Sequence, residues 1–176
     1  MLRIAVDFDN VLADTTGAWI EQYNRIFKKS IDKQDIKEYR FWNSLHISRK
    51  LAFKIFFMVW SDWKNLRPLE QKSGLVVDEI SKFSEVDLVS SSLVDMHDWL
   101  SEKKYLFNKI IYTSQKSKLN YDIFVDDSPY VATEIIKKGG ICLLYDQPWN
   151  RLANHHNNLI RIRSLFEAPY ILKRLA

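Results

Sequence analysis

The chain has 176 residues, of which 47% are hydrophobic, so it is long and apolar enough for one folded domain with a modest insert, and wholesale disorder is excluded. Its 26 basic and 22 acidic side chains give a net charge of +4. The single cysteine, Cys142, excludes an internal disulfide framework and a multi-cysteine zinc site, and we expect a reducing, cytoplasmic location. No run of eighteen apolar residues and no signal peptide is visible, so we expect no membrane partner.

The first predicted strand covers residues 2–6 and runs directly into a segment with paired carboxylates. Asp7 and Asp9 can both face one ligand if the chain leaves extended geometry between them. Beside a divalent cation, one carboxylate could act as a nucleophile and the other as a general acid. The same segment also suits an acidic turn that caps the next helix, so both interpretations stay open at this point.

Residues 16–68 interrupt the pattern of strands and predict a mostly helical insert that packs on the rest of the chain. The insert holds four of the six tryptophans and five of the ten phenylalanines. Its eleven basic and five acidic side chains give it a charge of +6, which leaves −2 for the rest of the chain. One aromatic stripe has the spacing of a single helix face, and we expect it to pack in the core: Phe53, Phe56, Phe57 and Trp60.

Beyond residue 68, short apolar runs alternate with helical patterns. Four further strands are predicted, at residues 86–89, 109–112, 122–125 and 141–145. Helices are predicted at residues 74–83, 93–105 and 129–138. This alternation predicts an α/β fold with a parallel sheet, in which ligands bind beyond the carboxyl ends of the strands.

A second pair of carboxylates, Asp126-Asp127, follows the strand predicted at 122–125. Together with Asp7 and Asp9 it could bring three or four carboxylates to one edge of the sheet. Such repulsion is costly unless a hard cation offsets it, and oxygen ligands favour Mg²⁺. Asp-Asp-Ser-Pro is also a good helix start, and the two interpretations are compatible.

Four motifs in this order resemble those of the haloacid dehalogenase-like (HAD) phosphatase superfamily. They are Asp7-x-Asp9-x-Val11, Ser90 after the apolar pair Leu88-Val89, Lys116, and Phe124-Val125-Asp126-Asp127. The resemblance implies a Rossmann-type parallel sheet with helices on both faces, built from residues 1–15 and 69–176, and makes residues 16–68 a small helical C1-type cap. Within the superfamily, the Asp7–Thr15 segment, the Asp-Asp motif and residues 145–151 are most similar to the 5'(3')-deoxyribonucleotidase-like group.

The resemblance implies a Mg²⁺-dependent phosphomonoesterase with defined roles for the acidic residues. Asp7 would attack phosphorus and form an aspartyl phosphate. Asp9 would protonate the leaving alkoxide and then activate water. The metal would be held by the Asp7 carboxylate, the Asp9 backbone carbonyl and Asp126, with Asp127 supporting it; the sequence does not decide which residue of the Asp126–Asp127 pair binds directly.

The same resemblance assigns the phosphate-binding groups. Ser90 would donate a hydrogen bond to a phosphoryl oxygen, and Lys116 would neutralise charge on it. Lys118 competes with Lys116, which fits better because it lies ten residues before Asp126. Ser91 could contribute its backbone N–H to substrate binding, and Ser92 could instead start a helix.

The implied substrate is a small phosphomonoester, a (deoxy)nucleoside monophosphate in the first instance, with no obligate nucleic-acid partner. A base would stack on one or two insert aromatics outside the stripe, at about 1–3 kcal/mol per base. The candidates are Trp19, Phe41, Trp42 and Trp63. Trp19 is favoured because it follows the Asp7–Thr15 segment by about one helical turn.

Two alternatives remain. The first keeps the phosphatase chemistry but acts on a sugar phosphate or a nucleic-acid end. The second is a non-catalytic nucleic-acid-binding module, motivated by the net charge and the basic aromatic insert. The acidic remainder of the chain and the lack of an RNP, KH or zinc-finger pattern argue against it.

Other polar or reactive residues have structural explanations. We expect Cys142 to be a buried structural thiol. His155-His156 should lie in a solvated loop, and Arg161–Arg163 and Lys173-Arg174 should solvate a C-terminal face.

Overall fold

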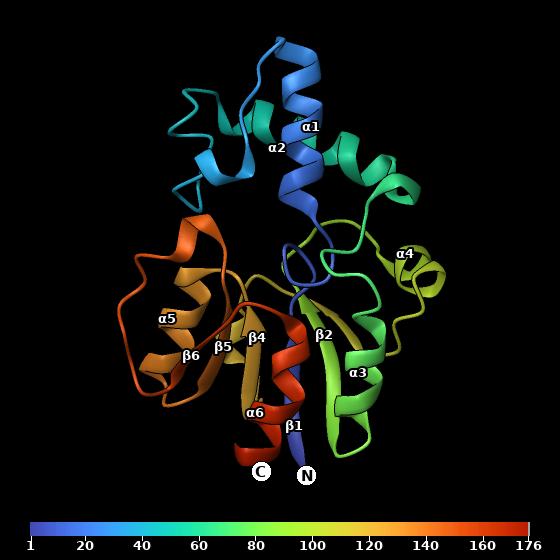
Figure 1. Cartoon of the computed structure of the whole chain (residues 1–176), viewed down its shortest axis with the longest axis vertical. Helices are drawn as coiled ribbons and strands as arrows, with labels where there is room; N and C mark the ends of the chain where they lie inside the picture. The colour runs from blue at the N-terminus through green and yellow to red at the C-terminus, as the bar shows by residue number, and fades with distance from the viewer. Residues whose placement is uncertain (176) are drawn as a thin grey trace.

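In the computed structural model, which describes residues 1–175, six strands form one parallel sheet in the order β3-β2-β1-β4-β5-β6 (Figure 1). The strands are β1 (Leu2–Val6), β2 (Ser84–Ser90), β3 (Ile110–Tyr112), β4 (Ile123–Asp126), β5 (Ile141–Tyr145) and β6 (Leu159–Ile162). Val6 of β1 pairs in register with Leu88 of β2 and Val125 of β4. The polar residues that follow these three strands therefore meet at one edge of the sheet.

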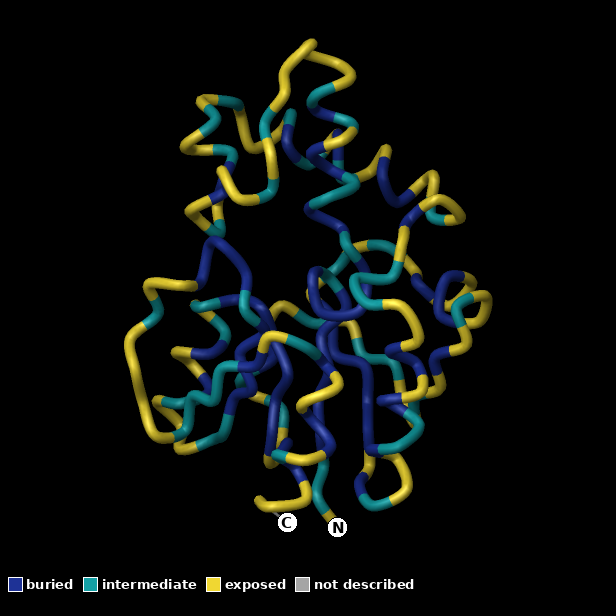
Figure 2. The backbone as a smooth tube through the Cα atoms, viewed as in Figure 1, coloured by how far each residue is buried: buried dark blue, intermediate teal, exposed yellow. Residues whose placement is uncertain are grey.

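Helices cover both faces of the sheet, which confirms the predicted α/β architecture. α3 (Gly74–Ser81) and α6 (Ala168–Leu175) pack together on one face, and α5 (Pro129–Lys137) packs against β4 and β5 on the other. Because side chains alternate between faces along a strand, Ile4 and Val6 join the first core whereas Ala5 joins the second. The central strands are buried on both faces (Figure 2).

The insert, residues 16–68, lies beyond the carboxyl ends of the strands, at the opposite end of the molecule from the two termini (Figure 1). Its elements are α1 (Thr15–Phe27), the 3₁₀ turn η1 (Lys33–Asp35), α2 (Arg49–Ser61) and the 3₁₀ turn η2 (Trp63–Asn65). The two segments that join the insert to the sheet run side by side. The Asp14 N–H donates to the Arg67 carbonyl at 3.0 Å, and the Leu69 N–H donates to the Leu12 carbonyl at 2.7 Å.

The five predicted strands are all present, but the sheet has a sixth strand, β6, that the sequence analysis missed. The expectation that Arg161–Arg163 only solvate a face is wrong, since Ile162 is fully buried and Arg161 bonds to Asp146. The run Leu159–Ile162 is short and half-buried and carries a charge, features that suit the edge of a sheet.

The helix predicted over 93–105 is much shorter than expected, since α4 covers only His97–Glu102. The Asp95 side chain accepts a hydrogen bond from the His97 N–H at 2.9 Å, and this local turn starts the helix late. Leu93 stays exposed, while Trp99 and Leu100 are buried as their spacing predicts.

Smaller expectations about individual side chains are confirmed. Cys142 is buried in β5, and His155, His156, Lys173 and Arg174 are exposed. Within residues 1–175, no helix is both long enough and apolar enough to cross a membrane.

Candidate active site

A tight loop after β1 turns the chain out of extended geometry. The Phe8 carbonyl accepts hydrogen bonds from the Leu12 and Ala13 N–H groups, and Asn10 adopts a left-handed conformation with φ 58°. The Phe8 ring anchors the loop, packing 5.1 Å from Trp60 and 4.9 Å from Trp99 between ring centroids. This loop places Asp7 and Asp9 at the carboxyl edge of the sheet.

Lys116 forms ion pairs with Asp7 of the first motif and Asp126 of the fourth. Its ammonium lies 2.7 Å from Asp7 Oδ1 and 2.8 Å from Asp126 Oδ2. Lys116 lies in the 3₁₀ turn η3 (Lys116–Lys118) before β4 and is buried, whereas Lys118 is exposed. The N-terminus of α5 fixes Asp126 from the other side, where the Ser128 N–H donates to Asp126 Oδ1 at 2.8 Å.

Three carboxylates form a compact cluster. Asp7, Asp126 and Asp127 each offer one oxygen, and these three atoms lie within 4.8 Å of one another. All three side chains are buried, and Lys116 supplies a single positive charge to them. Buried carboxylates with this excess of negative charge, presenting only oxygen ligands, fit a hard divalent cation.

The pKa values of these groups follow from their surroundings. Burial raises the pKa of Asp7 to about 8; Lys116 opposes this shift, and the charges of Asp126 and Asp9 add to it. Burial also raises the pKa of Asp9 to about 6. The Thr15 hydroxyl donates a 2.7 Å hydrogen bond to Asp9 Oδ1, which lowers this pKa and so limits the rise. The shift is smaller for Asp9, because the Thr15 hydrogen bond and the charge of Lys116 lower its pKa and only the charge of Asp126 adds to the effect of burial. The pKa of Asp127 is raised well above its ordinary value, first by burial and then by Asp126.

The serines after β2 divide between the sheet edge and the cavity. Ser90 ends the strand fully buried, and its hydroxyl accepts a hydrogen bond from the Ser92 N–H at 3.1 Å. Ser91 and Ser92 line the cavity. Ser92 does not start a helix, because its hydroxyl accepts from the Val94 N–H in a turn before α4.

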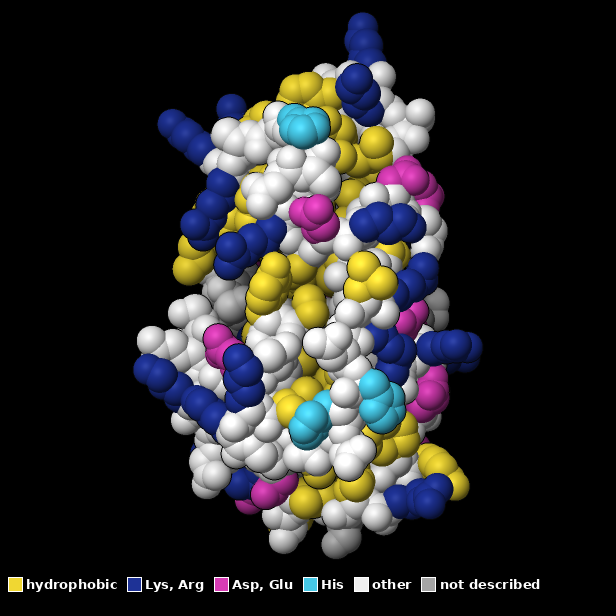
Figure 3. Space-filling model, turned by 90° about the vertical axis from the view of Figure 1, so that its left-hand side faces the viewer, with side chains coloured by type: hydrophobic (Ala, Val, Ile, Leu, Met, Phe, Trp, Pro, Cys, Tyr) yellow, Lys and Arg dark blue, Asp and Glu magenta, His cyan; other side chains and the backbone are white. Residues whose placement is uncertain are grey.

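A cavity of about 230 Å³ lies between the insert and the carboxyl edge of the sheet. Asp9, Asn10, Ser91 and Ser92 line its polar side. Most of its remaining wall is aromatic: Tyr39, Phe41, Trp42, Phe53, Phe56, Phe57, Trp60 and Trp149. On the face shown in Figure 3, Lys and Arg side chains lie around the edges of the whole molecule, including its upper half, where α1 and α2 lie. The cavity thus joins a carboxylate to a wall suited to a planar apolar group.

Comparison with known proteins identifies the family. The family model described as 5' nucleotidase, deoxy (pyrimidine), cytosolic type C protein (NT5C) matches residues 1–175. The chain belongs to the NT5C family. It is similar to a nucleotidase of Clostridium acetobutylicum, 24% identical over 99% of this chain and 95% of the relative. It is also similar to the 5'(3')-deoxyribonucleotidase of Bacillus subtilis, 28% identical over 90% of this chain and 91% of the relative.

Solved structures share the fold of this NT5C family member. A haloacid dehalogenase-like hydrolase from Xanthomonas campestris matches with a TM-score of 0.63 at 12% identity, covering 99% of this chain and 96% of the other. A HAD-superfamily hydrolase from Geobacter sulfurreducens matches with a TM-score of 0.60 at 13% identity, covering 97% and 99%. The chain is therefore a phosphoric monoester hydrolase of the HAD superfamily, as its motifs indicate, and not a non-catalytic nucleic-acid-binding module.

In this NT5C family member, several aromatic residues of the insert lie in places that differ from the prediction. The stripe of Phe53, Phe56, Phe57 and Trp60 lines the cavity. Its assignment to the core is confirmed for Trp60, which is buried, and wrong for Phe57, which is 49% exposed. Trp19, the favoured base-stacking candidate, is fully buried inside the insert, with its indole N–H donating to the Ala52 carbonyl at 2.9 Å. Trp63 does not line the cavity either, whereas Phe41 and Trp42 do. Helical periodicity shows that a stripe faces one way, but not what it faces.

Three site residues were missed by the sequence analysis: Thr15, Tyr39 and Trp149. Thr15 lies eight residues after Asp7 at the start of α1, and only the loop geometry brings its hydroxyl to Asp9. Tyr39 reaches the cavity from a segment without regular structure. Trp149 lies in η4 (Pro148–Asn150). Gln147, Trp149 and Asn150 belong to the segment 145–151 that resembles the deoxyribonucleotidase-like group, and this resemblance could have indicated Trp149 as a site residue.

Proposed function

We propose that this protein is a Mg²⁺-dependent 5'-nucleotidase that hydrolyses (deoxy)nucleoside monophosphates through an aspartyl phosphate on Asp7. The observation that carries the proposal is Asp9, which lines the aromatic cavity and lies two residues after Asp7 of the carboxylate cluster. A phosphate bound at the cluster would therefore have its leaving group directed into the cavity. A cytoplasmic setting belongs to the same proposal, because the one cysteine is a buried free thiol.

The acidic pair performs a two-step displacement in this proposal. A carboxylate oxygen of Asp7 attacks phosphorus as the ester P–O bond breaks, and the protonated Asp9 carboxyl transfers its proton to the leaving alkoxide. Asp9 then accepts a proton from water, which attacks the aspartyl phosphate and releases inorganic phosphate and the Asp7 carboxylate. A pKa of about 6 suits Asp9 to give and take a proton near neutral pH.

The remaining residues of the cluster bind and neutralise the phosphoryl group. Asp7, Asp126, Asp127 and the Asp9 backbone carbonyl would hold Mg²⁺, which supplies positive charge to the transferring phosphoryl oxygens. Lys116 adds a second positive charge, and Ser90 offers a hydroxyl at the end of β2. Ser91, beside Ser90, presents its groups to the cavity.

We propose that residues 16–68 act as a cap over a core of residues 1–15 and 69–176, and that the cap selects the substrate. The aromatic wall suits a nucleobase, which stacks on such rings at about 1–3 kcal/mol per base. Phe41, Trp42 and Phe57 are the stacking candidates that reach the cavity. The name of the Bacillus subtilis relative, a 5'(3')-deoxyribonucleotidase, supports a nucleotide over other phosphate esters.

A phosphate-release screen tests the proposal. The wild-type protein should hydrolyse nucleoside monophosphates in Mg²⁺ and fall to background in EDTA. Asp7→Asn should lose at least about 10³-fold in kcat while keeping its circular dichroism spectrum, because Asn is nearly isosteric but cannot form the acyl phosphate. Near-normal turnover by Asp7→Asn contradicts the covalent mechanism, and a preference for sugar phosphates over every nucleotide contradicts the substrate assignment.

A further inference from the structure

The 3₁₀ turn η4 connects three parts of the molecule that the proposed reaction uses. Gln147, just before η4, donates from its side chain to the Asn10 carbonyl at 2.9 Å. Asn150, at the end of η4, donates to the Asp127 carbonyl at 2.9 Å and to the Tyr145 carbonyl at 2.7 Å. η4 is thereby tied to the loop that carries Asp9, to the Asp-Asp motif and to the end of β5.

Trp149 makes the most direct contact between η4 and the carboxylate cluster. Its indole N–H donates to Asp127 Oδ2 at 3.0 Å, in a site where both residues are buried. Its ring forms part of the cavity wall. A single directional donor on one carboxylate oxygen fixes the rotation of that carboxylate, which leaves its other oxygen available to a cation.

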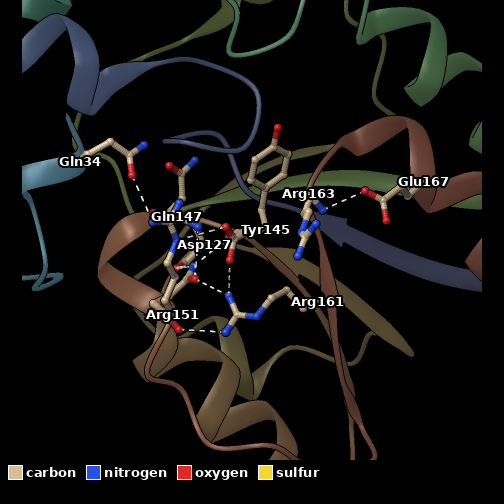
Figure 4. A network of polar contacts seen from close by, with 10 residues as sticks. Gln34, Asp127, Tyr145, Gln147, Arg151, Arg161, Arg163 and Glu167 are labelled. Carbon is tan, nitrogen blue, oxygen red and sulfur yellow. Dashed lines mark hydrogen bonds and ion pairs between the residues drawn. The ribbon is translucent and has the colours of Figure 1, made fainter. Parts of the chain in front are cut away.

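Polar side chains on both sides of η4 form a network, in which Figure 4 labels Gln147 and Arg161. Arg161 of β6 donates to Asp146 Oδ1 and to Asn150 Oδ1, both at 2.7 Å, and to the Asn150 carbonyl at 3.0 Å. The Asn150 side chain in turn accepts from the Gln147 N–H at 3.2 Å. These bonds determine the conformation of η4, so Trp149 has little freedom to leave Asp127.

The insert contacts η4 from its other side. The Lys33 ammonium lies 5.7 Å from the centroid of the Trp149 ring and 2.6 Å from Asp14 Oδ1. Arg151, next to η4, donates to the Gln34 side chain at 3.1 Å, as Figure 4 shows. The Trp149 ring is therefore held between the insert and the Asp-Asp motif.

We infer that Trp149 is a positioning residue that orients Asp127 within the metal-binding cluster through its indole N–H. The inference rests on the proposed function, since it needs a cation at Asp7, Asp126 and Asp127. Arg161 supports this role from a distance by fixing η4. Phenylalanine keeps an aromatic ring but lacks the indole N–H, so the ring and the hydrogen bond of Trp149 can be removed one at a time.

Direct metal binding tests this role without relying on turnover. Mn²⁺ prefers the same oxygen ligands as Mg²⁺ and can be titrated into substrate-free protein by electron paramagnetic resonance. Trp149→Phe keeps an aromatic ring but removes the N–H, and it should weaken Mn²⁺ binding about tenfold, the lower end of the effect of losing such a partner. Trp42→Phe is the matched control, because Trp42 also lines the cavity and makes no side-chain hydrogen bond within residues 1–175; its Mn²⁺ affinity should stay at the wild-type value.

A double-mutant cycle shows whether the effect acts through Asp127. In an Asp127→Ala background, Trp149→Phe should cause no further loss of Mn²⁺ affinity, because the carboxylate it orients is gone. If Trp149→Phe does not fold, Arg161→Lys replaces it, and this variant should weaken Mn²⁺ binding several-fold by loosening η4. Wild-type affinity in the folded variant, or equal losses in both backgrounds of the cycle, overturns the inference. A wild-type protein that binds no Mn²⁺ would instead overturn the proposed function.

Discussion

Lys116 lies between two carboxylates at the centre of the site, and its charge does not balance the cluster. Asp7 and Asp126 each contact its ammonium, while Asp127 lies within 4.8 Å of both without an ion pair to Lys116. The side chains are buried, so water screens their repulsion poorly. With its carboxylates ionised, the cluster carries more negative than positive charge, and this is the physical basis for the proposed metal requirement. Without a metal, the raised pKa values of Asp7 and Asp127 let protons offset that charge instead.

The proposed metal requirement predicts different results for two substitutions at the site. Asp126→Ala removes a ligand and should raise the Mg²⁺ concentration for half-maximal activity at least about tenfold. Ser90→Ala removes a hydroxyl proposed to contact phosphate, and it should lower kcat without moving that midpoint. Mg²⁺ titrations of phosphate release compare the two, and superimposable curves for wild type and Asp126→Ala would remove Asp126 from the ligand set.

The raised pKa of Asp7 predicts how the metal-free protein responds to pH. The folded-state pKa of about 8 exceeds the ordinary value of 3.8, so the folded protein holds a proton that the unfolded chain releases. The contribution of Asp7 to the free energy of unfolding is therefore fully present below pH 4 and is lost as pH rises toward 8. In EDTA, the wild type should lose more stability between pH 5 and pH 8 than Asp7→Asn does.

Denaturant unfolding at several pH values measures this difference. Adding Mg²⁺ should raise the melting temperature of the wild type more at pH 8 than at pH 5, because protons and metal compete for the same carboxylates. Parallel stability profiles for wild type and Asp7→Asn in EDTA would show that Asp7 titrates near its ordinary pKa.

At the scale of the element, α2 shows how one helix serves two surfaces. Ala52, Ile55 and Val59 are buried in the core of the protein, and Ala52 accepts the Trp19 hydrogen bond. Phe53, Phe56 and Phe57 turn toward the cavity instead. A helix that is apolar over most of its circumference can pack on a core and still present rings to a ligand.

The cavity face of α2 predicts a substrate-specific effect of Phe57. Phe57→Ala should raise KM for nucleoside monophosphates by about fivefold or more, the equivalent of about 1 kcal/mol of lost stacking, and spare p-nitrophenyl phosphate. Phe27→Ala is the matched control, because Phe27 is 37% exposed on α1 and does not line the cavity. An equal rise in KM for both substrates would mean that Phe57 shapes the fold of the insert and not the base site.

At the scale of the whole molecule, the sheet holds the carboxylates, and the insert is the region that we propose selects the substrate. The sheet buries apolar side chains against helices on both faces, while the insert adds a largely aromatic cluster around Trp19. Two adjacent connecting segments join the regions. The regions also share one core cluster, because Trp60 of the insert packs on Phe8 in the loop that carries Asp9.

Burial in the sheet predicts the cost of core substitutions. Leu143→Ala, in β5, should lower the free energy of unfolding by about 2–5 kcal/mol, because it leaves a cavity in a fully buried position. Leu152→Ala removes the same atoms from a side chain that is 93% exposed, and it should change stability by less than about 0.5 kcal/mol. Urea unfolding of the two variants gives the comparison, and similar losses would contradict the core described here.

The sequence by itself determined the α/β class, five of the six strands and the chain positions of the acidic motifs. These features depend on local patterns, because a buried parallel strand needs a continuous apolar run and the residues after it fall at the sheet edge. Four motifs in order also sufficed to indicate the superfamily that the comparisons confirm. β6 was missed because Arg161 interrupts the short apolar run Leu159–Ile162.

Only the tertiary structure decided which aromatic rings meet the cavity and which residue holds Asp127. Trp19 and Phe57 have similar local patterns, yet the packing of α1 against α2 buries the first and exposes the second. The contact between Trp149 and Asp127 joins residues 22 positions apart, through a turn fixed by Arg161. Such contacts depend on how separate elements pack in space, and residue periodicity within one element carries no information about its neighbour.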